Sequence, residues 1–241
     1  MNTQKTTFIR IGDFFFKYRN AVFPLLWVAL FLSFTPAEGF LTLPVILACG
    51  LVALGLFLRA AIIGFAYIKR GGLNKKVHAD TLVTEGFFNI CRNPLYVGNM
   101  LIYCGVFLMH GHPVVILFGI GGTFFIYQSI IAAEEYFLRN KFGENYDTYC
   151  HEVPRWGMKL GRVRAATSGM RFNFKRVLMK DYSTIANSLI TLIFIQALRH
   201  YKYDQPDMQQ HSLAWNIAAI VAIVLIAFGI SRAKKMKLLT L

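Results

Sequence analysis

Apolar residues gather into six long runs, and charged and polar residues collect in the short segments between them. The runs cover residues 21–34, 43–68, 95–109, 114–133, 183–198 and 213–230. A helix needs about 20 apolar residues to cross a bilayer, and shorter runs are completed by their flanks. The pattern therefore predicts an all-α integral membrane protein with about six transmembrane helices, the third and fourth forming a tight helical hairpin.

Composition supports this class of protein. Hydrophobic residues make up 56% of the 241 residues, only 16% are charged, and the mean hydropathy is +0.47. A chain with so little polar surface cannot cover the outside of an ordinary soluble domain. The first run has no small-residue cleavage motif after it, so we expect it to remain as a span and not to be a signal peptide.

The net charge of +14 is explained by where the basic residues lie. Six spans with a cytoplasmic N-terminus place all but three of the 26 Lys and Arg on the cytoplasmic side, including the loop over 69–92. This asymmetry follows the positive-inside rule. It predicts a multi-pass protein of a bacterial inner membrane or an ER-type membrane, with both termini cytoplasmic, and it makes nucleic acid unnecessary as a partner.

The cysteines indicate free thiols. Cys49, Cys91, Cys104 and Cys150 lie in spans or on the predicted cytoplasmic side and form no C-x-x-C pair. This arrangement favours reduced side chains over disulfides or a zinc site. We expect no metal.

A turn at 110–113, His-Gly-His-Pro, interrupts the apolar residues between the third and fourth runs. Arg92 lies about twenty residues before this turn, and the fourth run ends about twenty residues after it, so both arms return to the same membrane face. The hairpin therefore predicts that Arg92, Asn93 and Tyr96 lie near Glu134 and Glu135.

Three sequence motifs occur in a fixed order along this part of the chain. They are G-F-F-N-I-C-R-N-P-L-Y-V-G over 86–98, the pair Glu134-Glu135, and F-G-E-N-Y-D-T-Y-C-H-E-V-P-R-W over 142–156. Together, over about residues 45–156, they resemble the signature of the isoprenylcysteine carboxyl methyltransferase and phospholipid methyltransferase family. The resemblance implies an integral membrane methyltransferase that uses S-adenosylmethionine, with a cofactor site facing the cytoplasm.

The resemblance divides the chain into three parts. Residues 1–44 hold a segment of mixed Phe and basic residues suited to the headgroup region, followed by the first span. Residues 45–156 form the methyltransferase core. Residues 157–241, which the resemblance does not cover, hold a basic segment and a C-terminal hairpin of two spans.

The motif residues also have physical reasons to bind the cofactor. Pro94 marks the first turn of the third helix, so Arg92 stands beside a helix N-terminus and forms an anion site; alternatively, Arg92 only caps the span at the headgroups. Tyr96 offers a ring face to a cation. The residues expected to contact the cofactor are His78, Gly86, Arg92, Asn93, Pro94, Tyr96, Gly98, Glu134, Glu135 and Tyr146.

Arg59, Arg92, Glu135 and Arg155 are the expected catalytic residues. Arg59 lies about 15 Å inside the cytoplasmic face, where a cation either has a function, such as binding an acidic substrate group, or extends to the interface. Glu135 either binds the ribose hydroxyls or amino group of the cofactor or pairs with Arg139 on the helix surface. Arg155 is expected to close the site.

Two other classes of protein share some of these features. Sterol reductases have a similar architecture and a related motif but use NADPH, and a degenerate relative would be a non-catalytic scaffold. The motifs favour a methyltransferase acting on a lipidic or prenylated carboxylate or amine that moves in sideways from the bilayer. The acceptor and the oligomeric state are not determined by the sequence.

Overall fold

The computed structural model describes residues 5–38, 43–65, 77–203, 206–236 and 238, and these are helical or irregular throughout. The start of the loop expected after the second span, with Lys69, Arg70, Lys75 and Lys76, lies outside the described residues. The described part of the chain contains eight α-helices and two short 3-10 turns: α1 (Thr7–Ser33), α2 (Leu43–Phe65), η1 (Gly86–Asn89), α3 (Pro94–His110), α4 (Pro113–Phe142), α5 (Glu144–Glu152), η2 (Leu160–Arg162), α6 (Val163–Thr167), α7 (Phe174–Tyr203) and α8 (Pro206–Lys235).

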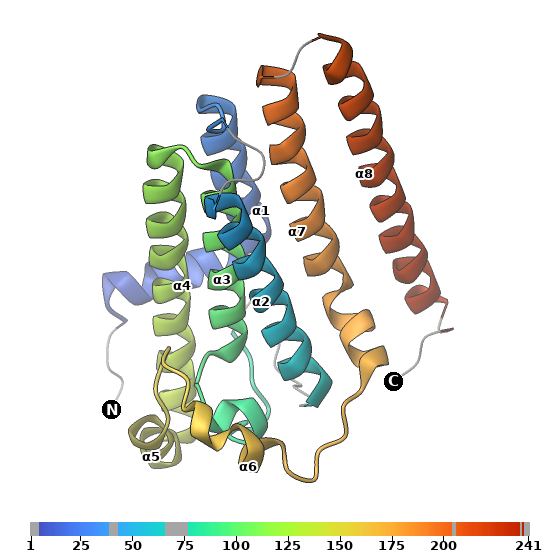
Figure 1. Ribbon diagram of the computed structural model, residues 1–241. Helices are drawn as coiled ribbons and strands as arrows, with labels where there is room; N and C mark the ends of the chain where they lie inside the picture. Colours follow the sequence, from blue (N-terminus) through green and yellow to red (C-terminus); the bar gives the residue numbers. More distant parts are fainter. Residues whose placement is uncertain (1–4, 39–42, 66–76, 204–205, 237, 239–241) are drawn as a thin grey trace.

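The six long helices form one bundle (Figure 1). We call the end that carries α5 and α6 the α5 end, and the opposite end, with the α3–α4 turn, the far end. Helix α2 packs along α3 and also contacts α7, α1 packs along α4, and α7 packs along α8. Each predicted apolar run coincides with one of these helices over most of its length; the first run extends one residue past α1, and residues 66–68 of the second run lie outside the described residues. Among the described residues, α1, α2, α4 and the part of α8 over 211–235 are long and apolar enough to cross a membrane, and α3 is a shorter apolar helix.

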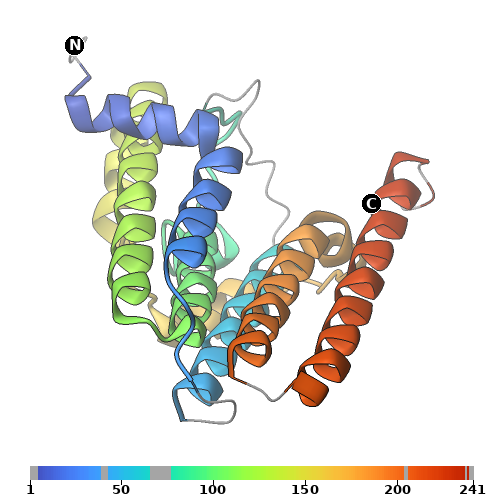
Figure 2. The same ribbon diagram turned by 90° about the horizontal axis from the view of Figure 1, so that it is seen from above.

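Helix α1 changes direction within its length. Its first part lies across α4, and its second part rises toward the far end (Figure 2). Pro24 lies inside the helix and has no N–H to donate, and its ring clashes with the carbonyl four residues earlier, which favours a bend. Gly12 is buried where α1 meets the Ser129 backbone of α4, so a side chain there would separate the two helices.

Small residues allow α2 and α3 to approach closely. A Cβ atom on Gly55 would lie 2.7 Å from the carbonyl oxygen of Gly98, and one on Gly105 would lie 2.5 Å from that of Ala48. Backbone atoms cannot move aside as a side chain can. The α2–α3 interface therefore depends on glycine at these positions.

Two alanine substitutions in α2 test this interface. Gly55→Ala should destabilise the protein by roughly 1–3 kcal/mol because the methyl group overlaps the α3 backbone. Gly50→Ala should be neutral or slightly stabilising, because no atom lies within 4 Å of its Cβ position and alanine favours the helix. Unfolding in a detergent titration, followed by circular dichroism, measures both; equal stability of the two variants would contradict the close packing.

The α3–α4 hairpin has the geometry that the sequence predicts. Pro94 begins α3, Gly111 ends it with a left-handed φ of 79°, and Pro113 begins α4. A left-handed backbone costs glycine little and most other residues more. The hairpin brings the residues before Pro94 back beside the end of α4 at the α5 end.

Polar contacts near both ends of α7 hold it against the rest of the bundle. Near the α5 end, Asp181 is buried and binds the Arg59 guanidinium of α2. Near the far end, the buried Arg199 donates from Nε to the Ala37 carbonyl at 3.0 Å and from Nη2 to the Met109 carbonyl. The first half of the C-terminal hairpin is therefore built into the bundle.

Candidate functional site

A cavity of about 950 Å³ runs from the α5 end into the bundle between α1, α3, α4 and α7. At the α5 end its wall includes Arg92, Tyr96 and Glu134. Further in, apolar and aromatic side chains of α1 and α3 line the cavity together with hydroxyl and amide side chains of α7. Pockets for small molecules typically measure about 300–1,000 Å³, so this cavity is large enough for a cofactor together with part of a second ligand.

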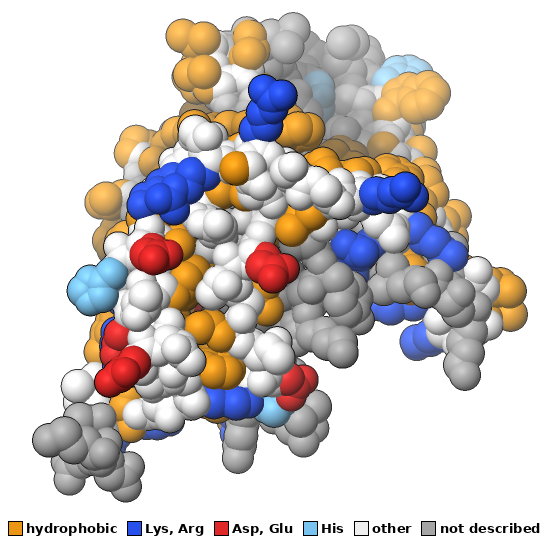
Figure 3. All heavy atoms as spheres, turned by 90° about the horizontal axis from the view of Figure 1, so that it is seen from below, with side chains coloured by type: hydrophobic (Ala, Val, Ile, Leu, Met, Phe, Trp, Pro, Cys, Tyr) orange, Lys and Arg blue, Asp and Glu red, His pale blue; other side chains and the backbone are white. Residues whose placement is uncertain are grey.

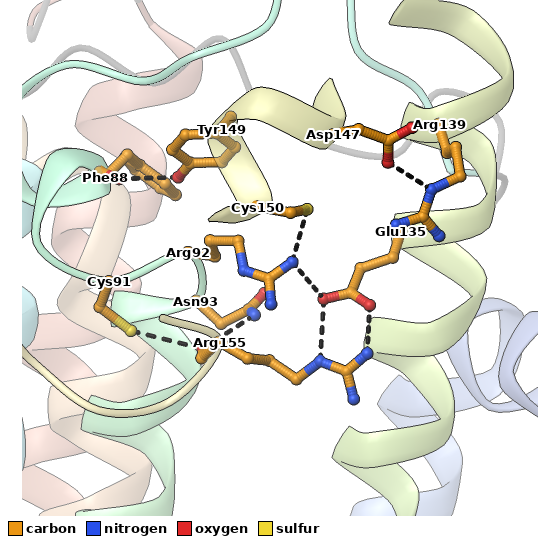
Figure 4. Close-up of polar contacts among 10 residues, drawn as sticks. All are labelled: Phe88, Cys91, Arg92, Asn93, Glu135, Arg139, Asp147, Tyr149, Cys150 and Arg155. Carbon is orange, nitrogen blue, oxygen red and sulfur yellow. Dashed lines mark hydrogen bonds and ion pairs between the residues drawn. The ribbon is translucent and has the colours of Figure 1, made fainter. Parts of the chain in front are cut away.

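Arg92 links three segments at the mouth of the cavity (Figure 4). Its Nη1 lies 3.2 Å from Glu135 Oε1 and donates to Cys150 Sγ at 2.6 Å. Its Nε is buried and has no hydrogen-bond partner among the described residues. Burial alone would lower the pKa of Arg92, but the Glu135 carboxylate and other neighbours raise the pKa above its ordinary value, so the side chain stays cationic.

Glu135 holds the segment after α5 against α4. Its carboxylate accepts two hydrogen bonds from Arg155, at 2.9 Å from Nε and a further one from Nη2 (Figure 4). The alternative pair of Glu135 with Arg139 does not form, because Arg139 binds Asp147 at 2.7 Å. Glu135 thus joins Arg92 and Arg155, and it is not part of the cavity wall.

Glu134 is the member of the acidic pair that faces the cavity. Tyr96, which also lines the cavity, donates a hydrogen bond from its hydroxyl to Glu134 Oε1 at 3.2 Å. Consecutive residues on a helix point about 100° apart, so only one of the two carboxylates can face inward. The predicted closeness of Arg92 and Tyr96 to the acidic pair is confirmed by these contacts.

The segment from α5 to Trp156 covers the mouth of the site, and hydrogen bonds fasten it to the residues before α3. The Tyr149 hydroxyl donates to the Phe88 carbonyl at 2.7 Å, and Asn93 Nδ2 donates to the Arg155 carbonyl at 3.1 Å. Cys91 donates its thiol to the Arg155 and Trp156 carbonyls, and burial raises the pKa of Cys91, which keeps the thiol protonated. The motif over 142–156 thus contains the short helix α5.

The other expected cofactor residues fall into two groups. His78, Asn93 and Pro94 line the cavity, and His78 also bonds Asp80 at 3.0 Å. Among the described residues, the cavity wall does not include Gly86, Gly98 or Tyr146. Gly86 begins η1 with a φ of 60°, and a Cβ on Gly98 would meet the Arg59 stem at 2.6 Å, so both have structural reasons to be glycine.

Tyr146 belongs to α5, and its side chain lies close to Arg92. The side chain is buried, and this burial together with the nearby Glu135 carboxylate raises the pKa of its phenol well above the ordinary value. The phenol therefore stays protonated and can donate a hydrogen bond within the charged cluster. Tyr146 therefore contacts Arg92 without lining the cavity.

Arg59 lines the cavity with its charge already paired. Nε and Nη2 bind the Asp181 carboxylate, and Nη1 donates to Asn99 Oδ1 at 2.5 Å. Thr184 accepts a fourth hydrogen bond at 3.3 Å. The guanidinium fork expected to bind an acidic substrate group is occupied by Asp181.

Sequence reasoning missed Asp181, Asn99 and Cys150 as partners of the site arginines. One signal was present for Asp181, which is the first acidic residue after a long basic segment and stands where an apolar run begins. An acidic residue in a span is costly unless paired, so it could have been matched with Arg59. No comparable signal marked Asn99 or Cys150.

A bundle of long apolar helices with a cavity whose mouth carries charged side chains defines an integral membrane protein with room for a small-molecule ligand. The family model described as phospholipid methyltransferase matches residues 43–145, and that family stands with the isoprenylcysteine carboxyl methyltransferase-like membrane enzymes. No curated protein and no solved structure gives a significant match. The matched family consists of methyltransferases that use S-adenosylmethionine, which favours this activity over an NADPH-dependent reductase or a scaffold.

The chemistry of the cavity mouth fits S-adenosylmethionine. The buried Arg92 Nε is a cationic donor without a hydrogen-bond partner among the described residues, which suits the carboxylate of the methionine part. Glu134, whose carboxylate accepts from the Tyr96 hydroxyl on the same wall, is an acceptor that suits ribose hydroxyls and an amino group. Both halves of the cofactor thus have complementary groups at the α5 end.

Proposed function

We propose that the protein methylates a lipophilic acceptor that reaches the cavity from the bilayer. The observation that carries this proposal is the continuity of one cavity, with the family's charged residues at its mouth and apolar walls deeper in the bundle. A water-soluble acceptor would not need such walls. A lipid would bring its reactive group to the α5 end while its chain stays among apolar side chains.

In this proposal Arg92 binds the cofactor carboxylate through its unpartnered Nε, assisted by the N-terminus of α3 beside Pro94. Glu134 accepts hydrogen bonds from the cofactor, and Tyr96 orients Glu134. Glu135 and Arg155 act one step away by holding the segment after α5 over the site. His78 and Asn93 complete the wall.

S-adenosylmethionine supplies an electrophilic methyl group on a sulfonium. The residues of the chain therefore need to orient the acceptor, hold it in line and exclude water. When an anionic acceptor meets a cationic donor, charge separation is lost on the way to the transition state, and a low-dielectric cavity favours that change. The apolar walls and the cover formed by the segment after α5 serve this purpose.

We further propose that six helices span the membrane and that both termini and the α5 end are cytoplasmic. Helices α3 and α7 complete the set of six, α3 being short and α7 carrying polar residues near the α5 end. Viewed from the α5 end, Lys and Arg side chains are spread over the surface (Figure 3). This distribution supports the assignment through the positive-inside rule.

Cysteine labelling tests the proposed topology. In a variant without native cysteines, Gly111→Cys at the far end should react with an impermeant thiol reagent added from outside, and Gly143→Cys at the α5 end should react only after the cytoplasmic side is exposed. Both positions lie at helix ends, Gly143 being exposed and Gly111 partly exposed. Labelling of position 111 from the cytoplasm would contradict the orientation.

The function itself is tested by comparing lipids from cells with and without the protein. Mass spectrometry should find a lipid that gains one methylene unit only when the protein is present, and feeding methyl-labelled methionine should label that lipid. The Arg92→Ala variant is the control, since it keeps the protein but removes the cofactor. Identical lipid and small-metabolite profiles in all three strains would count against a lipid acceptor.

A further inference from the structure

Two helices outside the family-matched segment form the walls of the deeper cavity. The matched segment is 43–145, whereas α1 precedes it and α7 follows it. The α1 residues that line the cavity recur every three or four positions, from Phe16 through Arg19, Phe23 and Trp27 to Phe31. This spacing places them on one face of the helix, so α1 presents a continuous wall.

Helix α7 presents a second wall. Thr184, Asn187, Ser188, Thr191 and Phe194 line the cavity with helical spacing. The contacts of Asp181 and Arg199 hold α7 on either side of this stretch, so its orientation toward the cavity is fixed. Among the described residues the Asn187 side chain makes no hydrogen bond, so its amide can receive a ligand.

Both walls change in character from the α5 end to the far end. The second part of α1 and α7 run in the same direction, with α3 between them (Figures 1 and 2). On α1, Arg19 and Asn20 near the α5 end are followed by aromatic and aliphatic residues, and on α7 the hydroxyl and amide side chains are followed by Phe194. The two walls together match an amphiphile with its polar head toward the α5 end.

The charges of the cavity indicate which kind of head is favoured. Arg59 is paired with Asp181, and Arg92 is paired with Glu135. Arg19 also lines the cavity, stacks its guanidinium over the Phe16 ring at 4.5 Å, and forms no ion pair among the described residues. Arg19 is thus a cavity-lining arginine whose charge has no acidic partner in the described part of the chain.

We propose that Arg19 binds an anionic group, a carboxylate or a phosphate, on the head of a lipid acceptor, with Asn187 hydrogen-bonding the head and Trp27 and Phe31 contacting the chain. This inference rests on the proposed function, and it assigns acceptor recognition to Arg19 in place of Arg59. Arginine suits both anions because its planar fork donates two parallel hydrogen bonds. The side chain is a specificity-determining residue, and it lies outside the family-matched segment.

Binding of four brominated amphiphiles of equal chain length tests the proposal. They are a fatty acid, a monoacyl phosphate, a monoacylglycerol and an alkylamine, added to the full-length protein in phosphatidylcholine nanodiscs. Trp156→Phe and Trp215→Phe leave Trp27 as the reporter, whose quenching measures occupation of the cavity. The fatty acid, the monoacyl phosphate or both should bind more tightly than the monoacylglycerol and the alkylamine, and the better of the two anions identifies the group.

Arg19→Gln should weaken binding of the favoured anionic probe by about tenfold or more, as expected for loss of a charged hydrogen bond, and leave the monoacylglycerol unchanged. Lys17→Gln is the matched control, since Lys17 is exposed on the same helix and does not line the cavity. Equal binding of all four probes, or unchanged anion binding in Arg19→Gln, would overturn the proposal.

Calorimetry with S-adenosylmethionine is run in parallel on the unmodified protein. If the unmodified protein did not bind the cofactor, the proposed function would be overturned. If it bound the cofactor but did not distinguish the four probes, only the role of Arg19 would be overturned.

Discussion

The Arg92→Ala variant should lose S-adenosylmethionine binding while the protein remains folded. Arg92 lines the cavity, and its buried Nε has no hydrogen-bond partner in the described part of the chain, so its removal takes away the donor proposed for the cofactor carboxylate. A hydrogen bond to a charged group contributes roughly 1.5–3 kcal/mol, which corresponds to about a tenfold to a hundredfold loss of affinity. Calorimetry on the purified variant measures the effect.

Arg139→Ala is the control for this experiment. Arg139 is also an arginine near the end of α4 that pairs with an acidic residue, but it is exposed and does not line the cavity. Its removal should leave cofactor affinity unchanged, because surface pairs contribute little. Wild-type affinity in Arg92→Ala would show that the cofactor is bound elsewhere.

The same calorimetry on Glu134→Gln and Glu135→Gln distinguishes the roles of the two carboxylates. Glu134 is expected to contact the cofactor directly, and Glu135 is expected to act by holding the segment after α5.

The Asp181→Ala variant should be strongly destabilised. Asp181 has a side chain only 1% exposed, and its partner Arg59 is 11% exposed, so the substitution leaves a nearly buried guanidinium without its carboxylate. Removing one partner of a buried pair typically costs about 3–5 kcal/mol. Detergent-induced unfolding should show this loss, and α7 should become more accessible to proteases near the α5 end.

A double variant separates the charge effect from a general packing effect. Arg59→Met with Asp181→Leu replaces both charges by apolar side chains of similar size and should restore most of the stability, since buried pairs can often be replaced in this way. Arg59→Ala alone should also destabilise the protein, because it leaves the buried Asp181 carboxylate unpaired. If Asp181→Ala were as stable as the parent protein, the pair would not hold α7 in place.

The sequence predicted the helices and the α3–α4 hairpin well, because each depends on local signals. Apolar runs mark the helices, and Pro94, Gly111 and Pro113 mark the ends of α3 and α4. The hairpin then brings Arg92 and Tyr96 to the acidic pair by helix length alone. The contacts at this mouth could therefore be anticipated without knowledge of the tertiary packing.

The remaining features depend on how distant elements pack. The sequence favoured Glu135 as the cofactor residue, but the rotation of α4 turns Glu134 to the cavity and Glu135 to Arg155. The sequence also left the partner of Arg59 open, because the contact joins residues 122 positions apart. Neither the helix rotation nor the position of α7 is encoded in a local motif. For the same reason the sequence did not show that α7, the first helix of the C-terminal hairpin, lines the cavity.

Methyl transfer to lipid by the purified protein tests the central claim most directly. The protein is reconstituted into liposomes made from a total lipid extract, supplied with methyl-labelled S-adenosylmethionine, and the lipids are extracted and counted. The account predicts that label accumulates in one extractable lipid class with the unmodified protein and not with Arg92→Ala. If the protein bound S-adenosylmethionine and the label remained entirely in the aqueous phase, a lipid acceptor in the cavity between α1 and α7 would be contradicted.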